Sequence, residues 1–158
     1  MVEDDVNAKP VYKSFRYANK LVWKSARRGR LSVPGKPELD VGSPPEFKGE
    51  PGIWSPEEFL VGALNACLML TFLTLTRSKG LELVGYDSAA EGLLENVDGK
   101  YQITQVTVQP SVVLKTQVDL EAARIIMGEV ERNCFISNSI KAEIKLVPQL
   151  HVSAEGAN

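Results

Sequence analysis

Two cysteines, Cys67 and Cys134, carry the most distinctive chemistry in this chain of 158 residues. A free thiol is both a nucleophile when ionised and one of the most commonly buried side chains. Two cysteines are too few for the disulfide framework of a secreted domain, so they are either inert buried thiols or a functional pair. No Cys-x-x-Cys motif is present, and spacing alone therefore favours two inert thiols.

Other catalytic groups are scarce. The single histidine, His151, lies in a segment without a recognisable motif, which argues against a Ser-His-Asp or Cys-His arrangement. The chain also has too few His and Cys residues for a zinc site, and no glycine-rich phosphate loop. Its net charge of −2 argues against nucleic acid as a partner.

Arginine and glutamate are the charged residues that could act on a thiol here. Arg27, Arg28 and Arg30 cluster in the segment KSARRGR, and Glu57 lies at the start of a predicted helix. Apolar surroundings raise the pKa of a thiol, whereas a nearby guanidinium lowers it. Arginine stays charged when poorly solvated and can bind a carboxylate through two hydrogen bonds. A thiol, an arginine and a glutamate could thus form a self-consistent site. The ordinary alternatives are that the arginines form a solvated cationic turn and that Glu57 is a charge at the start of a helix.

The helix that carries Cys67 has clear sequence signals. Ser55 is a favoured N-cap, Pro56 suits the first helical position, and Glu58 completes a capping box. The helix is expected to run to about Ser78 and to end at Gly80. It is apolar on nearly every face, which predicts a helix surrounded by protein, most easily in an intertwined dimer.

The remaining elements predict an α+β fold in a single domain over residues 1–158, with residues 1–10 frayed. Asp98-Gly99 predicts a hairpin, and Asp119 is expected to cap the second helix. The expected segments are a strand at 11–23, a cationic turn at 24–30, an irregular loop at 43–54, paired strands at 83–97 and 101–115, a helix at 118–133, and a last strand at 141–152.

Two stretches together resemble the OsmC/Ohr family of thiol-dependent peroxidases. They are FKGEPGIWSPEEFLVGALNACLMLTFL and ERNCFISNSIKAEIKL, and WKSARRGRLSV is similar to the arginine-bearing loop of that family. The resemblance spans almost the whole chain. It implies an OsmC-like fold in which antiparallel sheets wrap around long central helices in an intertwined homodimer.

The resemblance also implies roles for four residues. Cys67 would be the peroxidatic thiol that attacks an organic hydroperoxide, and Cys134 the resolving thiol that forms a disulfide with it. Arg27 matches the family arginine best, with Arg28 one position away as the alternative, and Glu57 matches the glutamate that orients it. An external dithiol, of lipoyl type, would be the reductant, with no bound cofactor and no metal.

Two aromatic residues depart from the family pattern beside the expected pocket. Phe135 follows the second cysteine where many members have proline, and Trp54 precedes the helix. They are expected to line the substrate pocket with apolar surface, which suits a bulky organic or fatty-acid peroxide better than hydrogen peroxide. Filling a gap in the core is the ordinary alternative for both.

The spacing of Glu57 and Cys67 has a geometric consequence. Ten helical positions span roughly 15 Å, so the two side chains cannot meet within one helix. Two copies of the helix crossing antiparallel near Gly62 and Ala63 would bring residue 57 of one subunit toward residue 67 of the other. We therefore expect a homodimer with two composite sites.

Two other functions compete with a peroxidase. A long apolar helix wrapped by sheet also suits an acyl- or lipid-binding module, and a redox pair also suits a thiol sensor without turnover. The opening segment has no apolar signal region, and the apolar run at 60–75 is interrupted by polar residues. The expected protein is therefore cytoplasmic, with no membrane partner.

Overall fold

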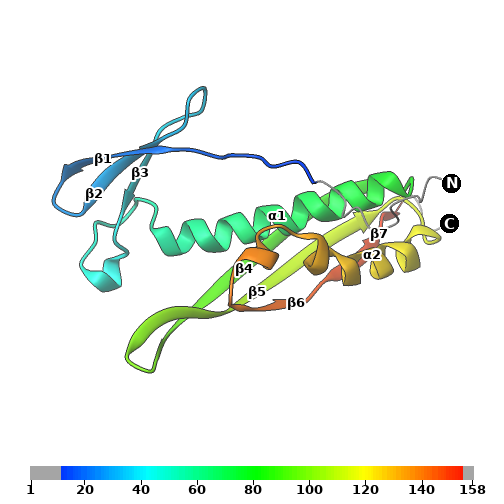
Figure 1. The fold of residues 1–158 in the computed structure, drawn as a ribbon. Coiled ribbons are helices and arrows are strands. Elements are labelled where there is room, and N and C mark those ends of the chain that lie inside the picture. Colours follow the sequence, from blue (N-terminus) through cyan, green and yellow to red (C-terminus); the bar gives the residue numbers. More distant parts are fainter. Residues whose placement is uncertain (1–11, 155–158) are drawn as a thin grey trace, which may run out of the picture.

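The computed structural model describes residues 12–154, in which two α-helices pack against a long β-hairpin and a small sheet lies at one end (Figure 1). The residues 1–10 that were expected to be frayed lie outside this range. The elements are β1 (Lys20–Ser25), β2 (Arg28–Ser32), β3 (Leu39–Gly42), η1 (Pro45–Phe47), α1 (Pro56–Ser78), β4 (Leu83–Val97), β5 (Lys100–Leu114), α2 (Asp119–Asn133), η2 (Ser137–Ser139), β6 (Glu143–Leu146) and β7 (Gln149–Val152).

Helix α1 begins as its sequence predicts. The Ser55 hydroxyl accepts a hydrogen bond from the Glu58 N–H at 3.2 Å, and the Glu58 carboxylate accepts one from the Ser55 N–H at 2.7 Å. This reciprocal capping box satisfies two of the N–H groups that a helix start leaves free. The helix ends at Ser78, and Gly80 follows with a φ of 71°. The predicted helix is confirmed.

The long hairpin and its neighbours form the main sheet. Strands β4 and β5 pair antiparallel through a turn in which Asp98 and Gly99 have φ values of 52° and 82°. Strands β6 and β7 both pair with β5 in parallel. The prediction of a single last strand at 141–152 is therefore wrong. Strand pairing is interrupted between Leu146 and Gln149, where Pro148 has no N–H to donate.

The N-terminal sheet, β1-β2-β3, is antiparallel and lies apart from the main sheet (Figure 1). The strand predicted at 11–23 begins only at Lys20, and residues 12–19 are extended without strand pairing. The predicted cationic turn is narrower than expected, because Arg28 and Arg30 belong to β2 and bind Asp40 of β3. Arg28 and Arg30 hold the pKa of Asp40 below its usual range.

Helix α2 starts at Asp119, but Asp119 does not cap it. The N-cap position is Val118, which makes no side-chain capping bond. The Asp119 carboxylate instead accepts a hydrogen bond from the Thr116 hydroxyl at 2.7 Å. The prediction of Asp119 as the N-cap is wrong, because Asp119 is already the first helical residue and Val118 holds the N-cap position.

The core lies between α1, α2 and the face of the sheet that they cover. Gly92 of β4 allows close contact with α1, since a Cβ there would lie 2.6 Å from a methyl group of Val61. The fully or nearly buried apolar side chains come from both helices and β5: Leu64, Leu68, Phe72, Val106, Val108, Val112, Leu114, Ala123, Ile126, Met127, Val130 and Cys134.

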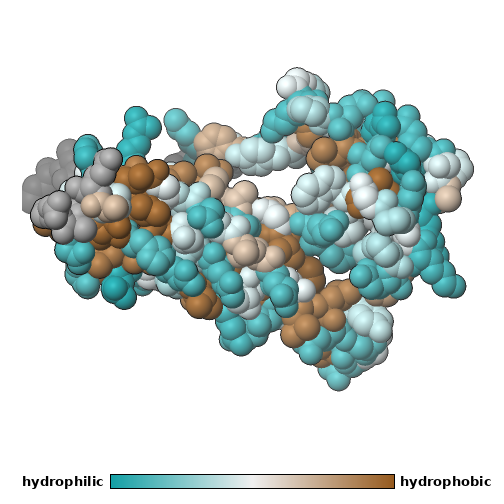
Figure 2. All heavy atoms as spheres, turned by 180° about the vertical axis from the view of Figure 1, so that it is seen from behind, coloured by the Kyte–Doolittle hydropathy of each residue, from teal (hydrophilic) through white to brown (hydrophobic). Residues whose placement is uncertain are grey.

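One stripe of α1 is covered and the rest is not. The buried residues of α1 are Leu64, Leu68, Phe72 and Thr76, which repeat every fourth position. Apolar side chains reach the surface at several places on the face shown in Figure 2, and the α1 residue Leu70 is 57% exposed. By length and composition α1 could cross a membrane, but the core helix of a soluble protein meets the same test.

We expect Ser55→Ala to lower the free energy of unfolding by about 1 kcal/mol, because it removes half of the capping box. Urea or thermal denaturation followed by circular dichroism measures the change. Ser78→Ala, at the exposed end of the same helix, is the control and should shift stability by less than about 0.5 kcal/mol. Equal stability of the two variants would contradict the role of the cap.

Candidate active site

The fold brings the two cysteines into contact. Cys67 lies in the middle of α1 and is half-buried, whereas Cys134 is the C-cap residue of α2 and is 0% exposed. Because α1 packs against α2, the two thiols are close enough for each to affect the pKa of the other. Both are free thiols in this structure.

Hydrogen bonds make Cys67 the more acidic thiol of the pair. Partial burial acts to raise its pKa, because a low dielectric disfavours the charged form. The Cys134 thiol, the backbone N–H groups of Ile136 and Phe135, and the Thr71 hydroxyl act in the opposite direction and outweigh burial. The pKa of Cys67 is therefore below its ordinary value.

Cys134 shifts the other way. Burial and the hydrogen bond with Cys67 raise its pKa, while the Ser137 hydroxyl and N–H oppose the shift without cancelling it. The Ser137 N–H lies 3.4 Å from the Cys134 sulfur. Cys67 therefore ionises at a lower pH than Cys134.

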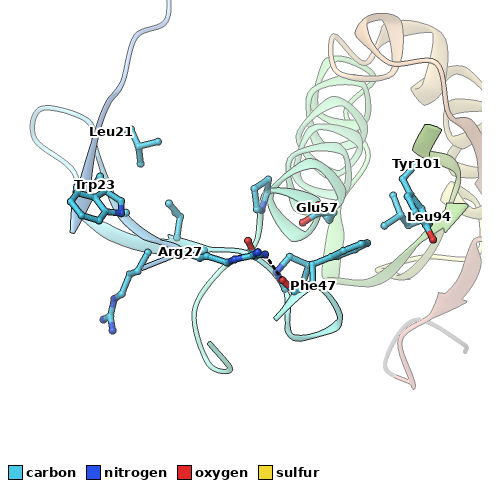
Figure 3. Close-up of a pocket in the computed structure, with 14 residues that line it drawn as sticks. Leu21, Trp23, Arg27, Phe47, Glu57, Leu94 and Tyr101 are labelled. Carbon is cyan, nitrogen blue, oxygen red and sulfur yellow. Dashed lines mark hydrogen bonds between the residues drawn. The ribbon is translucent and has the colours of Figure 1, made fainter. Parts of the chain in front are cut away.

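Arg27 and Glu57 line a different cavity, of about 710 Å³, at the N-terminal end of α1 (Figure 3). Arg27, in the turn between β1 and β2, extends into it and donates a hydrogen bond to the Phe47 carbonyl at 2.6 Å. Glu57 points into the same space from the first turn of α1, and its Oε2 is buried without a hydrogen-bond partner among the described residues. The two share a cavity, but no ion pair joins them within residues 12–154.

Arg28, the alternative to Arg27, is occupied elsewhere. Its guanidinium binds Asp40, and it also lies 3.4 Å from Glu50. Although Arg28 also borders the cavity, its guanidinium is paired with these two carboxylates. Of the two arginines, Arg27 is the one free of carboxylate partners within the described part of the chain.

The two aromatic residues predicted to line the pocket lie outside this cavity. The Trp54 ring stacks on Phe59 of α1 with ring centroids 5.6 Å apart. Phe135 is 81% exposed. Their role in binding substrate stays a prediction.

Sequence reasoning missed other side chains. Trp23, Phe47, Leu94 and Tyr101 line the cavity, and Phe47 and Tyr101 meet edge to face with centroids 5.8 Å apart. No local motif marks them, because they come from four separate elements. Thr71 could have been found, since it follows Cys67 by four positions on the same helix.

The predicted site residues therefore fall into two separate groups in one chain. The thiol pair lies in the middle of α1, and the Arg27–Glu57 cavity lies at its start. None of the residues that line the cavity is a cysteine. Within residues 12–154, no three His, Cys, Asp or Glu side chains are grouped so that they could hold a metal ion.

Comparison with known proteins identifies the family. Residues 49–148 match the family model described as OsmC-like protein. The chain belongs to the OsmC-like family. The matched OsmC-like region contains Glu57 and both cysteines, while Arg27 lies before it. The resemblance seen in the sequence is confirmed.

Two relatives in the OsmC-like family have different descriptions. The uncharacterized protein YmaD of Bacillus subtilis is 28% identical over 119 residues, covering 73% of this chain and 79% of its own. Peroxiredoxin OsmC of Escherichia coli is 29% identical over 104 residues, covering 66% of this chain and 71% of its own. The second description supports peroxidase-type oxidoreductase chemistry at the level of the OsmC-like family.

Solved structures share the OsmC-like fold. An OsmC-like protein of unknown function from Vibrio cholerae aligns with a TM-score of 0.78 at 24% identity, over 85% of this chain and 99% of that one. An organic hydroperoxide resistance protein from Elizabethkingia anophelis aligns with a TM-score of 0.69 at 16% identity, over 89% of this chain and 100% of that one. The predicted α+β OsmC-like fold is confirmed, and the homodimer stays a prediction.

We expect iodoacetamide to label Cys67 before Cys134. The pKa of Cys67 is lowered, so its thiolate forms at a lower pH than that of Cys134, and its labelling rate should rise with pH and level off above that pKa. Cys134 has a raised pKa and should need more alkaline solution. Mass spectrometry of the two cysteine peptides from the reduced protein measures both rates. In urea the rates should converge, and equal rates in the folded protein would refute the assignment.

Proposed function

We propose that this protein is a thiol-dependent peroxidase that reduces organic hydroperoxides to alcohols in oxidative stress defence. The observation that carries the proposal is the contact between Cys67 and Cys134, with the pKa of the first lowered and that of the second raised. The description of an E. coli relative as a peroxiredoxin and of a structural neighbour as an organic hydroperoxide resistance protein supports the same chemistry.

The reaction follows from the properties of the two thiols. The Cys67 thiolate attacks one oxygen of the O–O bond; the bond breaks, and the leaving alkoxide takes a proton to become an alcohol. Cys67 is then a sulfenic acid. The Cys134 thiol attacks that sulfur, a disulfide forms, and water leaves. An external dithiol, of lipoyl type, reduces the disulfide and is itself oxidised to a disulfide.

The cavity at the start of α1 favours a large apolar substrate. Trp23, Phe47, Leu94 and Tyr101 give it aromatic and aliphatic walls, and Arg27 supplies a cation that can bind the polar peroxide end. A cavity of about 710 Å³ is within the range of small-molecule sites. We therefore propose aryl or fatty-acid hydroperoxides as substrates in preference to hydrogen peroxide.

We further propose that a second copy of the chain completes each site. Glu57 and Cys67 are about 15 Å apart along α1, so one chain cannot bring both to one peroxide. Gly62 and Ala63 lie on the exposed side of α1, and a Cβ added to Gly62 would meet nothing within 4 Å. An antiparallel crossing at this point would cover the exposed apolar side of α1 and bring the Arg27–Glu57 cavity of one subunit to the Cys67 of its partner.

Such a dimer is consistent with a soluble, cytoplasmic protein. In the most apolar 18-residue stretch of α1, 22% of the residues are buried within the single chain. A helix with so much exposed apolar surface requires a covering partner, and a second copy of the same helix supplies one without a membrane.

An apolar-ligand binding module is the second candidate function. The observation in its favour is that the cavity is mostly apolar and that the sulfurs do not line it. A thiol sensor without turnover is the third. The cysteine variants below separate all three.

We expect Cys67→Ser to reduce hydroperoxide consumption to background, because the nucleophile is lost. Cys134→Ser should complete one turnover and then stall, become overoxidised or depend on a different reductant, since no thiol remains to resolve the sulfenic acid. The measurement is consumption of cumene hydroperoxide and of a fatty-acid hydroperoxide, each compared with hydrogen peroxide, with dihydrolipoamide as reductant.

The other two functions give different results in this experiment. A binding module would retain its affinity for a fatty acid in both variants and consume no peroxide. A sensor would be oxidised stoichiometrically without sustained consumption. Sustained consumption by Cys67→Ser would exclude the proposed mechanism.

We expect two inactive variants to restore activity when they are combined. If the sites are composite, a dimer of one Cys67→Ser subunit and one Arg27→Met subunit has one site with an intact Cys67 and an intact Arg27. Co-refolded at equal amounts, the mixture should recover about a quarter of wild-type activity, because about half of the dimers are mixed and each has one working site.

The control mixture combines Cys67→Ser with Cys134→Ser subunits. Both cysteines of a site lie in one chain, so this mixture should not recover sustained turnover. Absence of recovery in the first mixture, with mixed dimers confirmed by mass spectrometry, would show that each site lies within one chain.

A further inference from the structure

Ser137 places two polar groups beside the sulfur of Cys134. Its N–H donates a hydrogen bond to that sulfur at a distance of 3.4 Å. Its hydroxyl oxygen is buried and has no hydrogen-bond partner among the described residues. Buried hydroxyls are nearly always paired, so this one needs an explanation. A hydroxyl beside a reactive sulfur can find its partner when that sulfur becomes charged.

The turn around Ser137 is held by hydrogen bonds that do not involve its hydroxyl. The Asn138 N–H donates to the Cys134 carbonyl at 3.1 Å. The Ser139 hydroxyl donates to the Phe135 carbonyl at 2.7 Å. Because these bonds fix the backbone, the Ser137 hydroxyl can rotate its O–H toward an acceptor that forms only during a reaction.

The burial of the two sulfurs indicates which of them an external dithiol reaches in a Cys67–Cys134 disulfide. Cys134 is 0% exposed, whereas Cys67 is half-buried. A thiolate from solvent therefore attacks Cys67, and Cys134 leaves with the electron pair of the broken S–S bond. The rate of such an exchange depends on the leaving sulfur, and a better stabilised thiolate leaves faster.

We propose that Ser137 stabilises the Cys134 thiolate as the leaving group when an external dithiol reduces the disulfide. The attacking thiolate forms a mixed disulfide with Cys67, and Cys134 leaves as a thiolate and then takes a proton. The second thiol of the reductant displaces Cys67 and closes the external disulfide. The inference rests on the proposed function, and it adds a residue for the half of the cycle that regenerates the two thiols.

Two donors at one sulfur suit a thiolate better than a neutral thiol. A neutral thiol is a weak acceptor, whereas hydrogen bonds to a charged acceptor are roughly twice as strong as neutral ones. Both the hydroxyl and the N–H of Ser137 act to lower the pKa of Cys134, although burial and Cys67 raise it overall. The N–H is already in place when the S–S bond breaks, so little reorganisation is needed at that moment.

The test is the rate at which dithiothreitol reduces the Cys67–Cys134 disulfide, formed beforehand in the full-length chain with diamide. We expect Ser137→Ala to slow the reduction by about tenfold, because it removes a hydrogen bond to a charged sulfur. The matched control is Ser139→Ala, which removes a hydroxyl of the same turn that bonds to the backbone, and it should react at the wild-type rate. Quenching with iodoacetamide and mass spectrometry of the cysteine peptides measure the rates.

The stability of the reduced chain separates this role from a structural one. Ser137→Ala should leave the free energy of unfolding unchanged or raise it, because it removes a buried hydroxyl without a partner. Ser137→Ala that reduces at the wild-type rate would overturn the inference. Equal slowing in Ser139→Ala would also overturn it, since the turn as a whole would then be responsible. A chain destabilised or unfolded by Ser137→Ala would do the same, because the hydroxyl would then be paired in the resting protein.

None of these readouts involves a peroxide, so the inference and the proposed function can fail separately. Slow reduction of the Ser137→Ala disulfide, in a protein whose wild-type form consumes no hydroperoxide, would refute the proposed function and leave this inference intact. Equal reduction rates, in a protein that consumes hydroperoxide, would refute this inference alone.

Discussion

Cys134 lies close to Cys67 because two helices far apart in the sequence pack against each other. Leu64 and Leu68 on α1 and Val130 on α2 are almost fully buried around the pair, so the sulfurs are held by close packing on one side. This burial also raises the pKa of both thiols and so favours their neutral form. The site depends on backbone donors that outweigh this effect at one sulfur and not at the other.

The groups that lower the pKa of Cys67 in the single chain lie apart from the Arg27–Glu57 cavity. The sequence suggested that a guanidinium would keep Cys67 charged, but Arg27 lies in that apolar cavity. An arginine delivered by a second subunit would then act mainly on the bound peroxide and on the charge that moves to the leaving oxygen. Glu57, with a buried oxygen that lacks a partner, is placed to receive and orient that guanidinium.

The parts of the fold that sequence could predict are those fixed by local rules. The capping box at Ser55 and the Asp98-Gly99 turn each involve a few neighbouring residues, and both are confirmed. The pairing of Arg28 with Asp40 depends on which strands become neighbours, and local patterns carry no such information. The break at Pro148 is different, because a proline inside a strand pattern is itself a local signal. Phe135 and Ile136 affect the pKa of Cys67 through their backbone N–H groups, and no residue type marks such groups in the sequence.

The parallel pairing of β6 and β7 with β5 also affects how the protein is made. These two strands are synthesised after β4 and β5, so one edge of β5 stays unpaired while the rest of the main sheet already has its partners. An open edge on a strand of 15 residues is a template for intermolecular pairing. Strands β6 and β7 therefore cover the exposed edge of β5. Chains truncated before residue 143 should be a source of aggregates during synthesis.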